Sequence, residues 1–170
     1  YGWEKLFTEK LCQYYLEDYG LETRVARFHN VYGPLGSYDD GREKAPAAIC
    51  RKVALAKPED EIEVWGDGLQ TRSFMHVDDC TEGVYRLVHS EHRQPLNLGT
   101  DRLVTIDELV DIVCHIAGKT VKKRHNLNAP QGVRGRNSDN KRVREVLGWE
   151  PLVSLEDGLA VTYRWIESEL

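Results

Sequence analysis

Helix-like and strand-like patterns alternate along this chain, and that alternation limits the fold more than any other feature. Apolar residues follow helical spacing over residues 3–18 and again over 46–56, and short strand-like runs occur at 23–28 and 61–65. Chains with this order fold as α/β domains. Only the first third has the spacing of a parallel β–α unit, so the rest is expected to form a small mixed α/β lobe.

Two helices carry strong local signals. Thr105 is followed three residues later by Glu108, which predicts a capping box, and Gly118 is expected to end this helix. Ser154 is expected to cap the last helix. The side chains predicted to face the core from that helix are Leu155, Leu159, Thr162, Tyr163 and Ile166.

The remaining elements have weaker signals. Asp78 or Asp79 is expected to cap a helix that carries Val84, Leu87 and Val88, and Ser138 to cap a short helix that ends near Gly148. Further strands are expected at residues 74–77, 95–98 and 121–126, the last at a sheet edge, and loops at 29–34, 35–43, 70–72 and 128–135.

Composition excludes several classes of protein. The 170 residues are 41% hydrophobic and 30% charged, as in ordinary globular domains, and the net charge of -5 argues against a nucleic-acid-coating surface. No apolar stretch approaches the roughly 20 residues that span a bilayer, so a membrane role is not expected and the cytoplasm is the expected compartment. The widely spaced Cys12, Cys50, Cys80 and Cys114 show no metal-ligand spacing; they are expected to be reduced and mostly buried, with no metal site.

Tyr1 and Lys5 stand four residues apart at the start of the first expected helix. This spacing places both side chains on one helix face, where an ammonium can stabilise a phenolate that takes a proton from a sugar hydroxyl. A surface pair without function is the alternative. Gly33, Gly36 and Gly41 do not follow a strand in the tight turn that holds a dinucleotide pyrophosphate, so the chain is expected to be the C-terminal half of a larger fold.

Three further segments occur in a fixed order after Tyr1 and Lys5: residues 27–34, 65–74 and 76–79. Together these segments resemble the extended short-chain dehydrogenase/reductase family that acts on nucleotide sugars, the NAD-dependent epimerase/dehydratases. The resemblance implies the C-terminal part of a Rossmann-type fold plus a small mixed α/β substrate-binding lobe. Residues 1–34 would be the remnant of the NAD-binding domain and 35–170 mainly the sugar-nucleotide lobe, with segments near 70–98 returning to the Rossmann domain.

Residues 41–48 and 132–140 resemble the GDP-mannose 3,5-epimerase branch of that family. The resemblance implies NAD as cofactor, contacted by Tyr1, Lys5 and His29, and transient oxidation of the sugar at C4 with Tyr1 as base. It implies proton exchange at C3 and C5, with Lys44 as one proton carrier. The second carrier of the branch is a cysteine upstream of the tyrosine, which none of the four cysteines here matches, so the isolated chain is expected to be inactive.

The resemblance also assigns contacts with GDP-mannose or a related nucleotide sugar. The implied residues are Asn30, Glu43, Lys44, Ala45, Lys52, Gln70, Arg72, Arg134 and Arg136. Arg72 and Arg136 are the strongest candidates because guanidinium groups bind phosphate oxygens in a bidentate manner. The alternative roles are surface ion pairs for the arginines, an exposed loop lysine for Lys44 and loop capping for Asn30.

Two other hypotheses about the function remain open. One is a different nucleotide-sugar epimerase, dehydratase or decarboxylase that uses UDP- or dTDP-sugars. The other is a non-catalytic module that binds a sugar nucleotide without an NAD-binding half. The resemblance also implies a homodimer, because helices flanking Tyr1 pair between subunits in many relatives.

Overall fold

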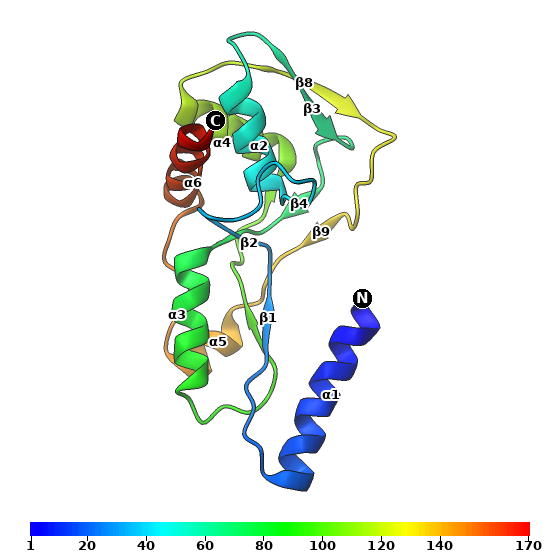
Figure 1. The fold of residues 1–170 in the computed structure, drawn as a ribbon, viewed down its shortest axis with the longest axis vertical. Helices are drawn as coiled ribbons and strands as arrows, with labels where there is room; N and C mark the ends of the chain where they lie inside the picture. Colours follow the sequence, from blue (N-terminus) through cyan, green and yellow to red (C-terminus); the bar gives the residue numbers. More distant parts are fainter.

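The computed structural model describes all of residues 1–170 and contains six helices (Figure 1). They are α1 (Gly2–Tyr19), α2 (Ala45–Leu55), α3 (Val77–Val88), α4 (Ile106–Ala117), α5 (Lys141–Leu147) and α6 (Leu155–Glu169). Nine short strands lie between them: β1 (Ala26–Phe28), β2 (Val31–Tyr32), β3 (Glu61–Trp65), β4 (Thr71–Arg72), β5 (Met75–His76), β6 (Leu96–Leu98), β7 (Val104–Thr105), β8 (Lys122–Asn126) and β9 (Gly135–Arg136).

The strands form four small sheets. Three of them are parallel pairs, β1 with β6, β2 with β5, and β3 with β8. In the fourth sheet β4 lies in the middle, antiparallel to β7 and parallel to β9. Helices alternate with mostly parallel strands, so the predicted α/β class is confirmed.

Two apolar clusters hold the fold together. The larger cluster joins α2, α4 and α6 to β3 and includes Val53, Val64, Val113 and Ile166. We call these three helices, together with the paired strands β3 and β8, the three-helix lobe. The smaller cluster lies around α3, α5 and β6 and includes Met75. Figure 1 shows the three-helix lobe at one end of the molecule and α3, α5 and β1 at the other.

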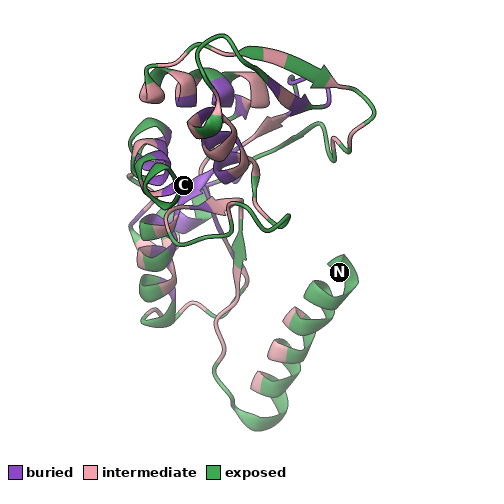
Figure 2. Ribbon diagram, turned by 45° about the horizontal axis from the view of Figure 1, so that its top comes forward, coloured by how far each residue is buried: buried purple, intermediate pink, exposed green.

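Helix α1 stands apart from both clusters. None of its residues is buried, as the colouring of Figure 2 shows. Trp3 is 84% exposed and Phe7 is 63% exposed. A bidentate ion pair between Glu9 and Arg27, with an Nε to Oε1 distance of 2.8 Å, ties α1 to β1. The helix ends at Gly20, which adopts the left-handed conformation (φ 67°) that glycine favours.

The helices with strong local signals form where the sequence places them. Thr105 and Glu108 make the reciprocal capping box of α4, and Gly118 ends that helix. Ser154 caps α6 by accepting a hydrogen bond from the backbone N–H of Asp157. All five residues predicted to face the core from α6 are buried, so this prediction is confirmed.

Two capping predictions were wrong. His76, not Asp78 or Asp79, caps α3, and its ring nitrogen lies 3.4 Å from the backbone N–H of Asp78. Asp79 instead turns inward and accepts hydrogen bonds from the backbone N–H groups of Leu152 (3.0 Å) and Val153 (2.9 Å).

At α5 the capping position belongs to Asn140 and not to Ser138. Asp139 accepts a hydrogen bond from the backbone N–H of Lys141 at 2.9 Å, while Ser138 is buried beside His29 next to Gly99. The helix ends at Gly148, as predicted.

Four two-residue strands were missed. Residues 31–32, 71–72 and 135 were expected to lie in loops, and no strand was predicted at residue 136 or at 104–105. Each of these strands exists only through pairing with a segment distant in sequence, and two residues are too few to show a periodic pattern. The missed pairing of β4 with β9 is the one that shapes the site described below.

The four cysteines are free. Cys50 and Cys80 are buried and Cys12 and Cys114 are half-buried, so the expectation of mostly buried cysteines holds for two of them. Burial raises the pKa of Cys50 to about 12. No helix combines the length and the apolar character needed to cross a membrane.

Candidate functional site

A cavity of about 440 Å³ opens between the start of α2, the end of β3 and the strand β4. Seven of the nine predicted substrate residues line it. They are Asn30, Glu43, Lys44, Ala45, Lys52, Gln70 and Arg72. These residues are separated by up to 42 positions in sequence, the difference between Arg72 and Asn30, and the fold gathers them around one space.

Backbone geometry places the residues at one end of the cavity. Asn30 follows β1 in the left-handed region (φ 45°), and its side-chain amide donates to the carbonyl of Ser73 at 2.9 Å. Lys44 is the N-cap residue of α2, with extended backbone angles, and Pro46 fixes the first turn of that helix. The side chain of Lys44 is exposed and makes no hydrogen bond or ion pair.

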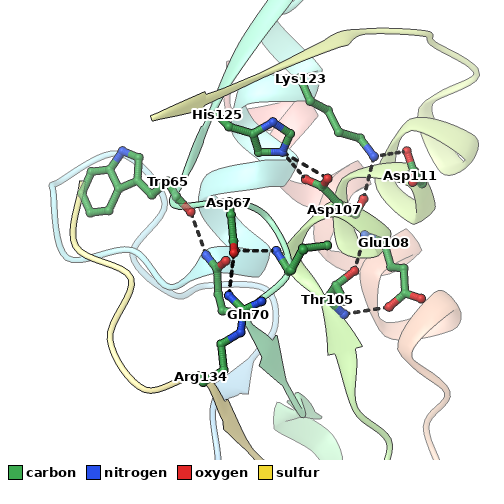
Figure 3. A network of polar contacts seen from close by, with 11 residues as sticks. Trp65, Asp67, Gln70, Thr105, Asp107, Glu108, Asp111, Lys123, His125 and Arg134 are labelled. Carbon is green, nitrogen blue, oxygen red and sulfur yellow. Dashed lines mark hydrogen bonds and ion pairs between the residues drawn. The ribbon is translucent and has the colours of Figure 1, made fainter. Parts of the chain in front are cut away.

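Two buried acceptor atoms in the cavity wall lack a hydrogen-bond partner. They are Oε2 of Glu43 and Oε1 of Gln70. The amide nitrogen of Gln70 donates to the carbonyl of Trp65 at 2.7 Å, which fixes the orientation of the amide and leaves its oxygen free (Figure 3). Unpartnered buried acceptors are costly, so these atoms suit a ligand that brings hydroxyl or N–H donors.

Arg72 is partly buried and carries a charge that no carboxylate balances. Its guanidinium donates to the carbonyls of Thr71 (2.7 Å) and Gln131 (3.1 Å), and no acidic side chain lies within ion-pair distance. Burial, with a smaller contribution from the charge of Arg136, lowers the pKa of Arg72. An anion bound here would stabilise the buried charge of Arg72 and would offset its repulsion from Arg136.

Arg136 is the direct partner of Arg72 in the register of the parallel pair β4–β9. Its guanidinium lies 3.4 Å from Oδ1 of Asn30, and like Arg72 it forms no ion pair. Arg136 is exposed and does not itself line the cavity, but it connects the arginine pair to Asn30, which does.

Arg134 is placed differently from the other two arginines. Its guanidinium binds the carboxylate of Asp67 at 2.7 and 2.9 Å, and it does not line the cavity (Figure 3). The hydrogen bond from Arg134 is the main reason that the pKa of Asp67 lies below its usual range. Lys52, in contrast, lines the cavity and donates to the carbonyl of Glu63 at 2.8 Å.

The residues predicted to contact the cofactor lie away from the cavity. Tyr1 is 88% exposed, and the ammonium of Lys5 lies 5.1 Å from the centre of its ring, so the two share one helix face as predicted. Neither residue lines the cavity. His29 is half-buried with Nδ1 unpartnered, and burial, followed by the charge of Arg136, lowers its pKa.

The glycines of residues 1–170 do not form the turn that holds a dinucleotide pyrophosphate between a strand and a helix. Helices α3 and α4 each follow a strand directly, and neither junction contains a glycine, while Gly33, Gly36 and Gly41 lie in a long loop before α2. These glycines therefore do not fit the pyrophosphate of NAD. No group of three or more metal-binding side chains is present.

Several residues of the cavity wall were not predicted from the sequence. Trp65 from the end of β3 and Pro130 and Gln131 from the segment before β9 also line it. Trp65 is 53% exposed, and its indole N–H donates to the carboxylate of Glu63 at 3.0 Å. An exposed tryptophan directly before the Gly66 turn was the available sequence signal, but the segment 128–135 offered none because its position depends on the distant pairing of β9 with β4.

The chain belongs to the NAD dependent epimerase/dehydratase family, whose family model matches residues 1–99. Over all 170 residues it is 51% identical to GDP-mannose 3,5-epimerase 1 of Oryza sativa subsp. indica, and the match covers 44% of that relative. It is 37% identical over 155 residues to UDP-glucuronic acid decarboxylase 4 of Arabidopsis thaliana, a match that covers 91% of this chain and 34% of the relative.

Among solved structures, the fold is similar to UDP-glucose 4-epimerase from Thermotoga maritima, which was solved with UDP-glucose. The TM-score is 0.87 at 29% sequence identity, and the match covers 99% of this chain and 53% of that one. The chain therefore spans about half the length of the relatives that it matches.

Proposed function

We propose that this chain is the sugar-nucleotide-binding part of an NAD-dependent epimerase that acts on GDP-mannose at C3 and C5. The single observation that carries the proposal is the cavity, which collects seven of nine residues predicted from the GDP-mannose 3,5-epimerase branch. The 51% identity to the rice enzyme over the whole chain supports the same assignment.

Arg72 and Arg136 are proposed to bind the diphosphate. Two guanidinium groups on adjacent strands, neither paired with a carboxylate, match an anion with two phosphates. The free acceptor atoms of Glu43 and Gln70 are proposed to accept hydrogen bonds from donor groups of the nucleotide sugar. Asn30 is held by its hydrogen bond to Ser73. It is proposed to contact the ligand between the diphosphate and the sugar.

Tyr1, Lys5 and Lys44 are proposed to move protons. When bound, NAD supplies the oxidant for C4 of the sugar. With α1 closer to the cavity than it lies here, Tyr1 would take the proton of the C4 hydroxyl, and Lys5 on the same helix face would stabilise the phenolate. A carbonyl at C4 makes the protons at C3 and C5 acidic. A base outside residues 1–170 would remove such a proton from one face of the sugar, and the unpaired ammonium of Lys44 at the cavity edge would deliver a proton to the same carbon from the other face.

The chain spans 44% of the rice relative, and the pyrophosphate cradle of NAD is not within these residues. We therefore expect residues 1–170 alone to bind the nucleotide sugar without converting it. The exposed apolar surface of α1 supports a further proposal, that the protein works as a homodimer through this helix. We place it in the cytoplasm.

Two alternatives stay in view because of specific observations. The 37% identity to a UDP-glucuronic acid decarboxylase favours a UDP-sugar enzyme as the second candidate. The position of the cavity wholly outside α1 is compatible with a non-catalytic module that binds a sugar nucleotide. A preference for GDP-mannose over UDP-sugars would favour the proposal over a UDP-sugar enzyme. Proton exchange at C3 and C5 would favour it over a non-catalytic binding module.

Incubation of the longest protein that contains this chain with NAD and GDP-mannose in heavy water, followed by NMR, tests the proposal. Deuterium at both C3 and C5 is the expected result, and Lys44→Ala should abolish it. Retained binding of GDP-mannose without label at either carbon would establish the binding module. Absence of binding would refute the GDP-mannose assignment and favour UDP- or dTDP-sugars.

A further inference from the structure

Residues 127–133 form a strap that connects the end of β8 to the start of β9 along one side of the cavity. Both ends of the strap are fixed, because Asn126 accepts a hydrogen bond from the backbone N–H of Gly66 and Arg134 accepts one from that of Thr71, each at 2.9 Å. Pro130 and Gln131, in the middle of the strap, contribute to the cavity wall.

The two large apolar side chains of the strap do not anchor it to the core. Leu127 is 66% exposed and Val133 is 57% exposed, and neither belongs to the two apolar clusters. Apart from the bonds by which the backbone N–H groups of Asn128 and Ala129 turn back to Asn126, residues 127–133 have one hydrogen bond to the rest of the chain, from Nη2 of Arg72 to the carbonyl of Gln131 at 3.1 Å. A segment with so few anchors opens at a small cost in free energy.

The turn after β3 holds the strap at two points. The side chain of Gln131 packs on Gly66, where a Cβ atom would lie 2.5 Å from its Cγ and where φ is 79°. One residue further, Asp67 binds the guanidinium of Arg134 at the C-terminal end of the strap (Figure 3). Asp67 also accepts a hydrogen bond from the backbone N–H of Leu69 at 3.0 Å, which fixes its own orientation.

We propose that Asp67 is a positioning residue: through Arg134 it holds the strap closed over one side of the cavity and so slows the release of a nucleoside diphosphate ligand. The inference rests on the proposed function, since it takes the ligand to be the diphosphate that binds at Arg72. Arg72 donates to the strap through one N–H and keeps further N–H groups for phosphate, so one guanidinium holds both the ligand and the closed strap.

The variant Asp67→Asn distinguishes the ion pair that Asp67 forms with Arg134 from the hydrogen bond by which Asp67 stabilises its own turn. Asparagine keeps an oxygen that can accept the hydrogen bond of Leu69 but removes the charge that holds Arg134. The matched control is Glu150→Gln, which removes the ion pair with Arg144 at 2.6 Å, a pair that does not involve the cavity.

Stopped-flow release of N-methylanthraniloyl-GDP and hydrogen exchange of the strap amides measure the effect in the full chain. We expect Asp67→Asn to raise the release rate about twofold to fivefold, the range that a partly exposed ion pair provides, with faster exchange of residues 127–133. High salt should raise the release rate of the wild type more than that of the variant, because salt weakens the contacts of the diphosphate in both but the ion pair of Asp67 only in the wild type. Glu150→Gln should match the wild type in both measurements.

An unchanged release rate in Asp67→Asn would overturn the proposal, and so would slower release, since that would make Asp67 a competitor of the ligand for Arg134. Unchanged exchange of the strap amides would overturn it as well. If the wild type itself fails to bind the labelled GDP, the proposed function falls, and the exchange measurement on the ligand-free chains still decides whether Asp67 holds the strap.

Discussion

Arg72 and Arg136 are register partners on the parallel strands β4 and β9, and neither guanidinium is paired with a carboxylate. Like charges on neighbouring strands destabilise a sheet, so the pair has a cost that a bound anion would offset. Most other arginines of the chain do form ion pairs, for example Arg102 with Glu156 and Arg124 with Glu61. The unbalanced pair beside the cavity is therefore the clearest electrostatic sign of a phosphate site.

Replacement of either arginine by alanine is expected to weaken the binding of GDP-mannose about tenfold or more, because each removes a hydrogen bond between charged groups. The slope of affinity against salt concentration should fall in both variants. Arg142→Ala is the control, since Arg142 is exposed on α5 and forms no ion pair. Isothermal titration measures all three, and equal affinity of Arg72→Ala and Arg142→Ala would contradict the assignment.

Asp79→Asn should lower the free energy of unfolding by about 1–3 kcal/mol. The carboxylate of Asp79 is buried and accepts two backbone N–H groups from residues 152 and 153, and asparagine would turn an N–H₂ group toward one of these donors. Asp78→Asn is a matched control in the same helical turn, because Asp78 is exposed. Urea unfolding should separate the variants clearly, and similar midpoints would show that the anchor has no energetic role.

Lys119→Met tests a lysine that caps a neighbouring helix. The ammonium of Lys119 donates to three carbonyls at the end of α2, those of Val53 (3.0 Å), Ala54 (2.7 Å) and Ala56 (3.0 Å). Loss of these bonds and of a positive charge at a helix C-terminus should cost about 1–3 kcal/mol of stability.

Lys57→Met serves as the control for this experiment, because the exposed side chain of Lys57 makes no hydrogen bond or ion pair. Thermal unfolding compares the two. An equal shift of the melting temperature in both variants would exclude a specific capping role.

Stability should fall as the pH drops below about 6.5, partly because of His29. Burial and the charge of Arg136 lower its pKa from the model-compound value of 6.5, so the unfolded chain binds a proton more readily than the folded one. The contribution of neutral His29 is therefore fully present above pH 6.5 and is lost as the pH falls through its folded-state pKa.

The variant His29→Gln should show a smaller loss of stability between about pH 7 and pH 5 than the wild type. Part of the loss should remain, because the pKa of His92 is lowered in the same direction, mainly by burial. His115→Gln, at an exposed position, is the control. Urea unfolding across the pH series gives the comparison, and parallel curves for wild type and His29→Gln would contradict the prediction.

Local signals explain which elements could be predicted from the sequence. The capping box of Thr105 and Glu108 and the apolar stripe of α6 lie within one segment each, and both formed as predicted. Strands β4 and β9 depend on contacts between residues 71–72 and 135–136, which no local pattern encodes. The cap of α3 was missed because Asp79, a good capping residue, is used for a tertiary contact instead.

In the candidate site, too, some features were predicted from the sequence and others depend on contacts between distant segments. Residues from 30 to 72 gather at the cavity as the family resemblance implied. The ion pair of Arg134 with Asp67 was not foreseen, because it needs the arrangement of the turn after β3 relative to β9. The separation of Tyr1 and Lys5 from the cavity was not foreseen either, since the position of α1 depends on tertiary contacts such as the ion pair of Glu9 with Arg27.

A calorimetric titration of the 170-residue chain with GDP-mannose, with UDP-glucuronic acid and UDP-glucose as competitors, tests most directly whether the cavity binds a sugar nucleotide. We expect one site per chain, binding of GDP-mannose in preference to both UDP-sugars, and loss of binding in Arg72→Ala. Absence of binding, or equal binding by the wild type and Arg72→Ala, would contradict the claim that this cavity holds a sugar nucleotide.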